Sequence, residues 1–266
     1  MLKRSIWLIT VLTFFCVSTA VSAEPVFRIV YNIKENLPRI MDDGTAINWS
    51  KPGITIELLR MVEKQIGVTF QFIRVPWKRG LYMVEHGAAD AAFHASFKVS
   101  RAEYGVYPAR DGKLDPARSI YKMTYALYAR KGSGVSWDGK TIRNISGPIG
   151  TVLSFAIADD LRKMGHEVEE EASVGINLDK LAAGRISAYA DMETIVDNVL
   201  NKLGPRYKTI EKLHPPLREK TYYLLVSKTF AANYPQLTER IWDAVRDVQQ
   251  TDAYREMLKK YQDQGY

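Results

Sequence analysis

The sequence predicts an α/β protein of two lobes joined by two crossing strands. Residues 26–95 alternate short β-rich runs with segments of helical periodicity, and residues 137–203 repeat that alternation in a smaller unit. Two longer strand candidates, 120–129 and 221–227, flank the smaller unit. Alternating strands and helices form parallel sheets whose faces the helices cover, and this pattern therefore sets the fold class.

The first unit follows a βαβαβ order. After a strand at 26–31, the apolar residues take up a helical spacing at 54–66, and Gly67 is placed to end that helix. Pro76 opens a second helix, which Gly87 ends. The other two strands are expected at 68–75 and 90–95.

The second unit is built from shorter elements. Ser154 is placed to cap a helix that runs to Lys163. The like charges of residues 167–171 favour an exposed strand or loop. The remaining elements are strands at 148–152 and 186–190 and helices at 176–183 and 192–203.

Two amphipathic helices end the chain, the second at 251–261. The apolar positions of the first are Leu237, Ile241, Ala244, Val245 and Val248. We expect this last part to pack back on the first lobe.

These elements predict lobe 1 from residues 24–127 and 222–266, and lobe 2 from residues 128–221. Ligands of α/β sheets bind at the carboxyl ends of strands. In a two-lobed protein those ends can face each other across a cleft, which closes around a ligand by hinge motion.

The first 23 residues have the features of a cleaved signal peptide. Lys3 and Arg4 precede an apolar run at 6–17, and Val21-Ser22-Ala23 forms a small-residue cleavage site. The alternative, a retained anchor helix, is disfavoured because the run is too short to span a membrane. A lipoprotein is disfavoured as well, because no small residues precede Cys16.

Removal of these 23 residues from 266 leaves 243, enough for a large core in one or two domains. It also removes the only cysteine, so the mature chain has no disulfide, thiol nucleophile or thiolate metal site. The formal charge falls from +7 to +5 with the loss of Lys3 and Arg4. Because the chain has no basic block with interleaved aromatic residues, nucleic acid is not an expected partner.

Arg101 follows the predicted strand 90–95, where a ligand in the cleft would be held. Its guanidinium can grip a carboxylate through two parallel hydrogen bonds, and Ser96 could add a hydroxyl. The alternative is an ordinary solvated arginine in a turn.

Asp191 ends the strand 186–190 and has the right charge for a ligand ammonium. The alternative role is an N-cap of the following helix. Ser154 has a similar ambiguity, since it could cap its helix or mark helix N–H groups that bind an anion.

Three aromatic residues complete the candidate ligand-binding set. Trp77 could stack on a ligand or cover a cation, although its spacing with Leu81 and Val84 also suits the core. Tyr31, at the end of the first strand, is a weaker candidate of the same type. Phe155 follows Ser154 in the second unit.

Catalytic and metal-binding motifs are missing from the sequence. The four histidines are scattered, no two of them at metal-ligand spacing, and His94 inside a strand suits a satisfied core histidine. The chain has no G-x-S-x-G, P-loop or H-E-x-x-H motif. We therefore expect no enzyme, no metal and no cofactor.

The sequence resembles the bacterial extracellular solute-binding proteins of family 3, the amino-acid-binding type of ABC transporters. Gly53-Ile-Thr-Ile-Glu-Leu-Leu with Gly67 resembles the family's first helix. Gly87-Ala-Ala-Asp-Ala91, followed by Ser96 and Arg101, resembles its G-x-x-D-A strand and S-x-T-x-x-R segment. Gly184-Arg-Ile-Ser-Ala-Tyr-Ala-Asp191 resembles its G-R-x-D-A-x-x-x-D segment.

The resemblance implies a type II periplasmic-binding-protein fold with two crossing hinge strands. In the family, the matching arginine grips the ligand's α-carboxylate and the matching aspartate holds its α-ammonium, which assigns those roles to Arg101 and Asp191. The chain departs from the pattern at Lys98, at Phe93-His94 and at Ser154-Phe155, which replaces a Gly-Thr-type turn.

We therefore predict a monomeric periplasmic protein that captures an amino acid or related zwitterion and delivers it to an inner-membrane ABC permease. One alternative is a periplasmic dehydratase-like enzyme on the same fold, which needs a carboxylate placed for proton transfer. The other is a soluble ligand-sensing module for a membrane receptor.

Overall fold

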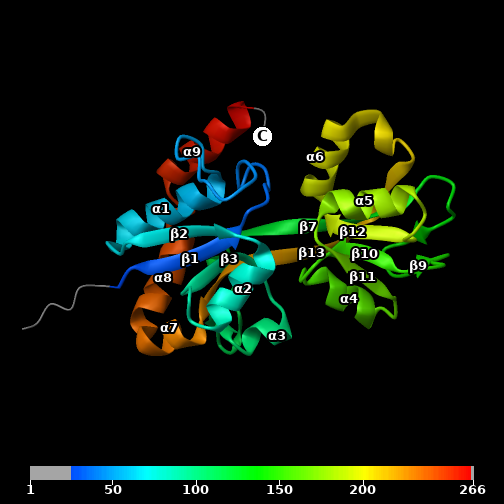
Figure 1. The fold of residues 1–266 in the computed structure, drawn as a ribbon. Coiled ribbons are helices and arrows are strands. Elements are labelled where there is room, and N and C mark those ends of the chain that lie inside the picture. The colour runs from blue at the N-terminus through cyan, green and yellow to red at the C-terminus, as the bar shows by residue number, and fades with distance from the viewer. Residues whose placement is uncertain (1–24, 265–266) are drawn as a thin grey trace, which may run out of the picture.

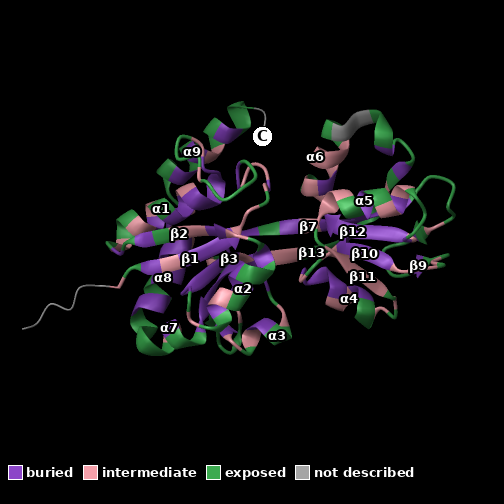
Figure 2. Ribbon diagram, in the orientation of Figure 1, coloured by how far each residue is buried: buried purple, intermediate pink, exposed green. Residues whose placement is uncertain are grey.

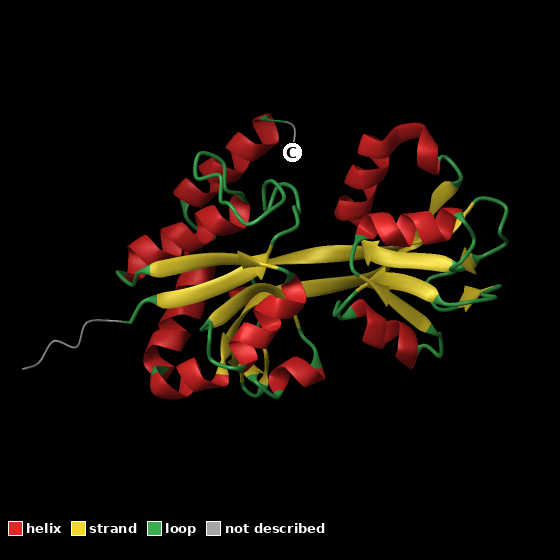
Figure 3. Ribbon diagram, viewed as in Figure 1, coloured by secondary structure: helices red, strands yellow, loops and turns green. Residues whose placement is uncertain are grey.

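The strands form two halves that are connected through the middle of one sheet (Figure 1). The computed structural model describes residues 25–264, so the predicted signal peptide lies outside the described residues. Within that part, nine strands form the sheet. Their order is β11 (Val168–Glu171), β10 (Ile149–Val152), β12 (Ala188–Met192), β7 (Tyr121–Arg130), β13 (Ile210–Ser227), β3 (Ala91–Ser96), β1 (Phe27–Asn32) and β2 (Phe70–Val75), with β4 (Gly105–Val106) paired to β13. Helices lie on both sides of the strands (Figure 3), which is the α/β arrangement that the sequence predicts.

The first half has the predicted βαβαβ order. Its strands β1 and β2 are parallel, as are β1 and β3, because a helix connects each successive pair. Gly67 adopts a φ of 75° and its N–H donates to the carbonyl of Glu63, which ends the first helix as expected. The elements are β1 (Phe27–Asn32), α1 (Ile54–Ile66), β2 (Phe70–Val75), α2 (Trp77–Glu85) and β3 (Ala91–Ser96).

Short elements follow β3 and lead to the first crossing strand, β7 (Tyr121–Arg130). The second crossing strand is β13 (Ile210–Ser227), whose 18 residues pair with β7 and then with β3. Both strands run from one half to the other (Figure 1). Between β3 and β7 lie α3 (Val99–Ala102), β4 (Gly105–Val106), β5 (Ala109–Arg110), β6 (Lys113–Leu114) and the 3₁₀ helix η1 (Pro116–Arg118).

The second half continues the sheet with β12, β10 and β11. The predicted capping role of Ser154 is wrong: α4 (Ile157–Lys163) has Ala156 at its N-cap, and Ser154 lies outside the helix with a φ of 65°. The strand β12 (Ala188–Met192) extends beyond the predicted end at residue 190, so Asp191 lies inside the strand.

Two-residue strands and short helices fill out this half. They are β8 (Ser136–Trp137), β9 (Ile142–Arg143), β10 (Ile149–Val152), α4 (Ile157–Lys163), β11 (Val168–Glu171), α5 (Val174–Ala182), β12 (Ala188–Met192), α6 (Glu193–Leu203) and the 3₁₀ helix η2 (Gly204–Tyr207).

The C-terminal helices return to the first half, where α8 and α9 contact α1. They are α7 (Lys228–Asn233), α8 (Pro235–Val248) and α9 (Asp252–Asp263). The five apolar positions predicted for the first amphipathic helix all lie on the buried face of α8. Figure 2 shows the general rule: the strands are mostly buried, while the helices expose their outer faces. No helix among residues 25–264 has both the length and the apolar character that a membrane span requires.

Candidate functional site

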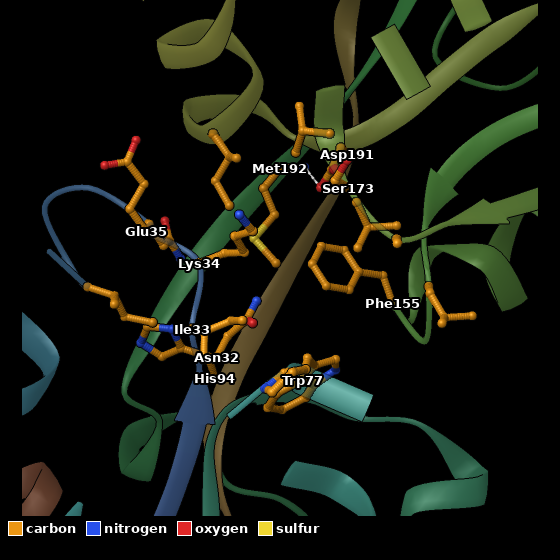
Figure 4. Close-up of a pocket in the computed structure, with 18 of the residues that line it drawn as sticks. Asn32, Ile33, Lys34, Glu35, Trp77, His94, Phe155, Ser173, Asp191 and Met192 are labelled. Atoms are coloured by element: carbon orange, nitrogen blue, oxygen red, sulfur yellow. Dashed lines mark hydrogen bonds between the residues drawn. The ribbon is translucent and has the colours of Figure 1, made fainter. Parts of the chain in front are cut away.

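A cavity of about 450 Å³ lies where the two halves meet (Figure 4). One wall comes from the first half: the end of β1 and the loop after it, the start of α2, the end of β3, and Arg101. The other wall comes from the turn after β10, the start of α5 and the junction of β12 with α6. Tyr125 and Tyr222 of the two crossing strands also line it. The cavity is large enough for a small metabolite and is built from both halves.

Arg101 is the buried cation of this cavity. It lies in the single turn of α3 and is 3% exposed. Its Nη1 donates to the carbonyl of Ser96 at 2.8 Å, and its Nη2 donates to the carbonyl of Ser154, on the opposite wall, at 2.7 Å. Its Nε has no hydrogen-bond partner within the described part of the chain. Because a guanidinium carries five N–H groups, Arg101 keeps donors for an anionic group in the cavity.

Trp77 covers this cation. Its indole ring lies 5.4 Å from the centre of the Arg101 guanidinium, at the distance of a cation–π contact. Trp77 is the first residue of α2 and only 9% exposed, and it also lines the cavity. The residue thus packs in the core, as its helical spacing suggests, and still reaches the site.

Asp191 is the buried anion of the cavity. Its carboxylate is fully buried and accepts hydrogen bonds from the hydroxyl of Tyr189 and, at 2.6 Å, from the backbone N–H of Met192. Burial raises the pKa of Asp191 to about 7, although both hydrogen bonds act in the opposite direction. Near neutral pH an ammonium group in the cavity would therefore favour the ionised form.

Two more predicted ligand residues line the cavity. Ser96 ends β3 and is buried beside Arg101, and its carbonyl also accepts from the hydroxyl of Tyr107. Phe155 projects from the turn after β10, on the wall opposite Trp77 (Figure 4).

The two remaining candidates do not line the cavity. Tyr31 is 1% exposed and stacks on Phe93 in the core, with ring centres 4.7 Å apart. Alternation along β1 turns the next residue, Asn32, toward the cavity in its place. Ser154 takes part through its backbone, since its carbonyl binds Arg101 and its N–H donates to Glu170.

The sequence reasoning missed several residues of the site. Tyr125 and Tyr222 form a hydroxyl–hydroxyl hydrogen bond of 2.7 Å across the crossing strands. Aromatic residues occur in any buried strand, so no local sequence signal marked these two tyrosines as residues of the site. Ser173 also lines the cavity, and its place before an apolar helical run was a readable cap signal that it fulfils by accepting from the N–H of Ile176.

Ion pairs connect the two walls near the cavity. Lys98 lies 3.2 Å from Asp159. Lys202 pairs with Glu35, which itself lines the cavity. Together with the bond from Arg101 to Ser154, these contacts join the two walls.

Residues 25–264 contain no cluster of three or more histidine, cysteine or acidic side chains arranged to hold a metal ion.

The profile of the family described as bacterial extracellular solute-binding proteins, family 3, matches residues 43–264. The chain belongs to this family. No curated protein sequence matches the chain.

Solved structures with the same fold share little sequence with this family member. A histidine kinase sensor domain with similarity to periplasmic binding proteins has a TM-score of 0.69 at 15% identity, and the match covers 90% of this chain and 96% of that one. The arginine-, lysine-, histidine-binding protein ArtJ from Geobacillus stearothermophilus has a TM-score of 0.67 at 13% identity, with 89% and 95% covered. The GluR0 ligand-binding core from Nostoc punctiforme, in complex with L-glutamate, has a TM-score of 0.64 at 15% identity, with 88% and 98% covered. At these identities the likeness shows the two-lobed fold and not the ligand.

Proposed function

We propose that this protein binds a small zwitterion, an amino acid or a close relative, between Arg101 and Asp191. The observation that carries the proposal is a buried cation and a buried anion lining the same cavity. Arg101 receives the ligand's carboxylate through its remaining N–H groups, and Asp191 receives the ammonium. A solute that lacks either charge leaves one buried ion unpaired, which costs several kcal/mol of binding free energy, and this cost sets the selectivity.

The two halves act as the lobes of a hinged trap. The proposed boundaries follow the crossing strands: residues 24–127 and 222–266 form lobe 1, and residues 128–221 form lobe 2. The contact of Arg101 with the carbonyl of Ser154 gives one reason for closure, since it joins the two lobes beside the ligand. Ser96, Trp77 and Phe155 complete the binding surface.

We further propose a periplasmic location after cleavage at Ala23, and delivery of the ligand by a monomer to an inner-membrane ABC permease. The family is one of extracellular solute-binding proteins, which supports this context. A soluble sensing role for a membrane receptor is the second candidate, favoured by the similarity to the histidine kinase sensor domain. We propose that the protein catalyses no reaction.

A thermal-shift screen of residues 24–266 against L-amino acids, polyamines and small acids tests the proposal. A ligand at a hundred times its Kd adds about 2.7 kcal/mol to the free energy of unfolding, so a true ligand raises Tm clearly. We expect the rise only with solutes that carry both a carboxylate and an ammonium group. Equal rises with simple acids or simple amines would contradict the proposal, and conversion of a solute during the assay would favour the dehydratase alternative.

A further inference from the structure

His94 interrupts the regular pairing of β3. In the ladder with β13, Tyr223 is opposite Ala95 and Leu224 is opposite Phe93, so His94 is left without a partner at a register shift. Its φ is 65°, a value that histidine adopts more readily than most residues with a side chain but that is uncommon inside a strand. Such β-bulges re-aim a side chain, often next to a functional site.

The bulge directs His94 to the cavity. His94 lines it and is half-buried there. In Figure 4, His94 lies to the left of Trp77 along the wall of the first half, and Trp77 is the ring that covers Arg101. A ligand whose carboxylate is held by Arg101 can therefore extend toward His94.

The contacts of the imidazole define which proton it carries. Its Nε2 lies 2.8 Å from Oγ1 of Thr55, a fully buried residue of α1. No other acceptor for this hydroxyl occurs among the contacts of the described residues, and a buried hydroxyl donates its proton where it can. Thr55 thus donates to Nε2, which leaves the proton of a neutral imidazole on Nδ1. Burial, with the positive charge of Arg39, lowers the pKa of His94 well below its usual value, so the ring is neutral.

Arg39 makes the surroundings of His94 positive. Its guanidinium lies 3.9 Å from the centre of the Tyr121 ring, whose edge-to-face partner at 4.6 Å is the His94 ring. Within residues 25–264 no carboxylate forms an ion pair with Arg39, so its charge is not neutralised locally. A positive charge near a neutral N–H donor favours a ligand group that accepts hydrogen bonds and disfavours a cationic one.

We propose that His94 is a specificity-determining residue that donates a hydrogen bond to an acceptor on the ligand's side chain, so that the cavity prefers amino acids with an amide or carboxylate side chain over those with a cationic one. The inference rests on the proposed function and adds the class of ligand. The similar structures include an arginine-, lysine-, histidine-binding protein, and the proposal therefore predicts a preference opposite to the one that this name describes.

Calorimetric titration with L-glutamine, L-glutamate, L-norvaline and L-arginine tests the inference in the wild type and in three variants. His94→Gly removes the ring at a φ that glycine adopts freely, so the backbone of the bulge is not strained. His94→Asn keeps a donor and tolerates the same φ. Thr55→Val removes the hydroxyl that fixes the proton on Nδ1, at nearly constant volume. Thermal melts of each variant without ligand confirm that it is folded.

We expect the wild type to bind L-glutamine or L-glutamate at least tenfold more tightly than L-norvaline and L-arginine. His94→Gly should lower that affinity about tenfold and leave the affinity for L-norvaline within twofold. His94→Asn should bind L-glutamine or L-glutamate more tightly than His94→Gly but less tightly than the wild type. Thr55→Val should also lose part of this affinity, because without the threonine hydroxyl the imidazole proton is free to move to Nε2.

Three results would overturn the inference. Tighter binding of L-arginine than of L-glutamine by the wild type would contradict the preference. If His94→Gly still preferred L-glutamine or L-glutamate over L-norvaline and L-arginine, residues other than His94 would set the preference. The proposed function would then still stand, provided that binding still required Arg101. Absence of binding by all four amino acids and by the wider screen would remove the proposed function and this inference together.

Discussion

Arg101 and Asp191 line the same cavity, but the protein holds them in different ways. Arg101 is bound by carbonyls of both walls, Ser96 on its own side and Ser154 on the other. Asp191 is bound entirely within its own wall, by Tyr189 and Met192. A guanidinium stays charged at any physiological pH, whereas burial raises the pKa of Asp191 to about 7.

Because of this difference, ligand binding depends on lobe closure at Arg101 and on pH at Asp191. The order of the Arg101 guanidinium depends on closure, because one of its two carbonyl partners belongs to the opposite wall. The Asp191 carboxylate is pre-ordered, but its charge depends on pH. We therefore expect affinity for the carboxylate end to follow lobe closure and affinity for the ammonium end to follow protonation.

Removal of Arg101 should have the largest effect. Arg101→Ala leaves the ligand's carboxylate buried without a partner, and we expect a loss of about 2–5 kcal/mol in binding free energy by calorimetry. Arg101→Lys should recover only part of it, because an ammonium cannot reproduce the guanidinium fork.

Arg79→Ala is the matched control, since Arg79 is exposed on α2 and does not line the cavity. Wild-type affinity in Arg101→Ala would make Arg101 a structural residue that only joins the two walls.

Replacement of Asp191 should change stability in a direction opposite to its effect on binding. The folded carboxyl has a pKa of about 7, against 3.8 for an ordinary aspartate, so the folded chain holds its proton more tightly than the unfolded chain. This contribution to stability is fully present below about pH 4 and is lost as pH rises through 7. At pH 8, Asp191→Asn should therefore raise the free energy of unfolding of the ligand-free protein by about 2–4 kcal/mol.

Urea unfolding of both proteins at pH 5 and pH 8 measures this change. The gain should be smaller at pH 5, about 1–2 kcal/mol, because the folded wild-type carboxyl is then protonated and only the ionisation of the unfolded chain still favours unfolding. A variant that is no more stable than the wild type at pH 8 would show that the buried charge is compensated by other groups.

The pH dependence of ligand binding should be a smaller effect than the stability change in Asp191→Asn. Between pH 8 and pH 6 the fraction of ionised Asp191 in the free protein falls about tenfold, and the affinity for a zwitterion should fall by about the same factor. The ligand's own charges do not change in this range. Calorimetry at three pH values should show that the affinity of Asp191→Asn does not change with pH. A wild-type affinity that does not change with pH would show that Asp191 does not bind the ligand's ammonium group.

Loss of the pair between Lys98 and Asp159 should have the smallest effect. Both side chains are partly exposed, at 21% and 35%, so Lys98→Ala should weaken ligand binding by at most about 1 kcal/mol. The effect should shrink further at high salt. Lys122 pairs with Glu219 between the crossing strands, and Lys122→Ala is the control that should leave ligand affinity unchanged. A loss of more than about 1 kcal/mol from Lys98→Ala would make the pair of Lys98 with Asp159 a main determinant of closure.

Much of this architecture could be predicted from the sequence, because it depends on local periodicity. The βαβαβ order of the first half and the buried face of α8 follow from apolar spacing alone, and the structure confirms both. Arg101 and Asp191 were found as charged residues close to the ends of buried strands, and both line the cavity.

Features that depend on distant partners could not be predicted. The bulge at His94 arises from pairing with β13, some 130 residues later, and nothing in the local sequence marks it. Tyr31 was misplaced toward the site because one residue of register decides which face of a strand a side chain takes. Ser154 resembled a helix cap, and its backbone conformation instead aims its carbonyl at Arg101.

The central claim is that both charges of one ligand are recognised in this cavity. Calorimetric titration with the tightest-binding L-amino acid, its carboxamide and its des-amino analogue tests it most directly. We predict that each analogue, which lacks one charge, binds at least tenfold more weakly than the amino acid, and that Arg101→Ala no longer distinguishes the amino acid from its carboxamide. Affinities for both analogues within twofold of that for the amino acid would contradict the account.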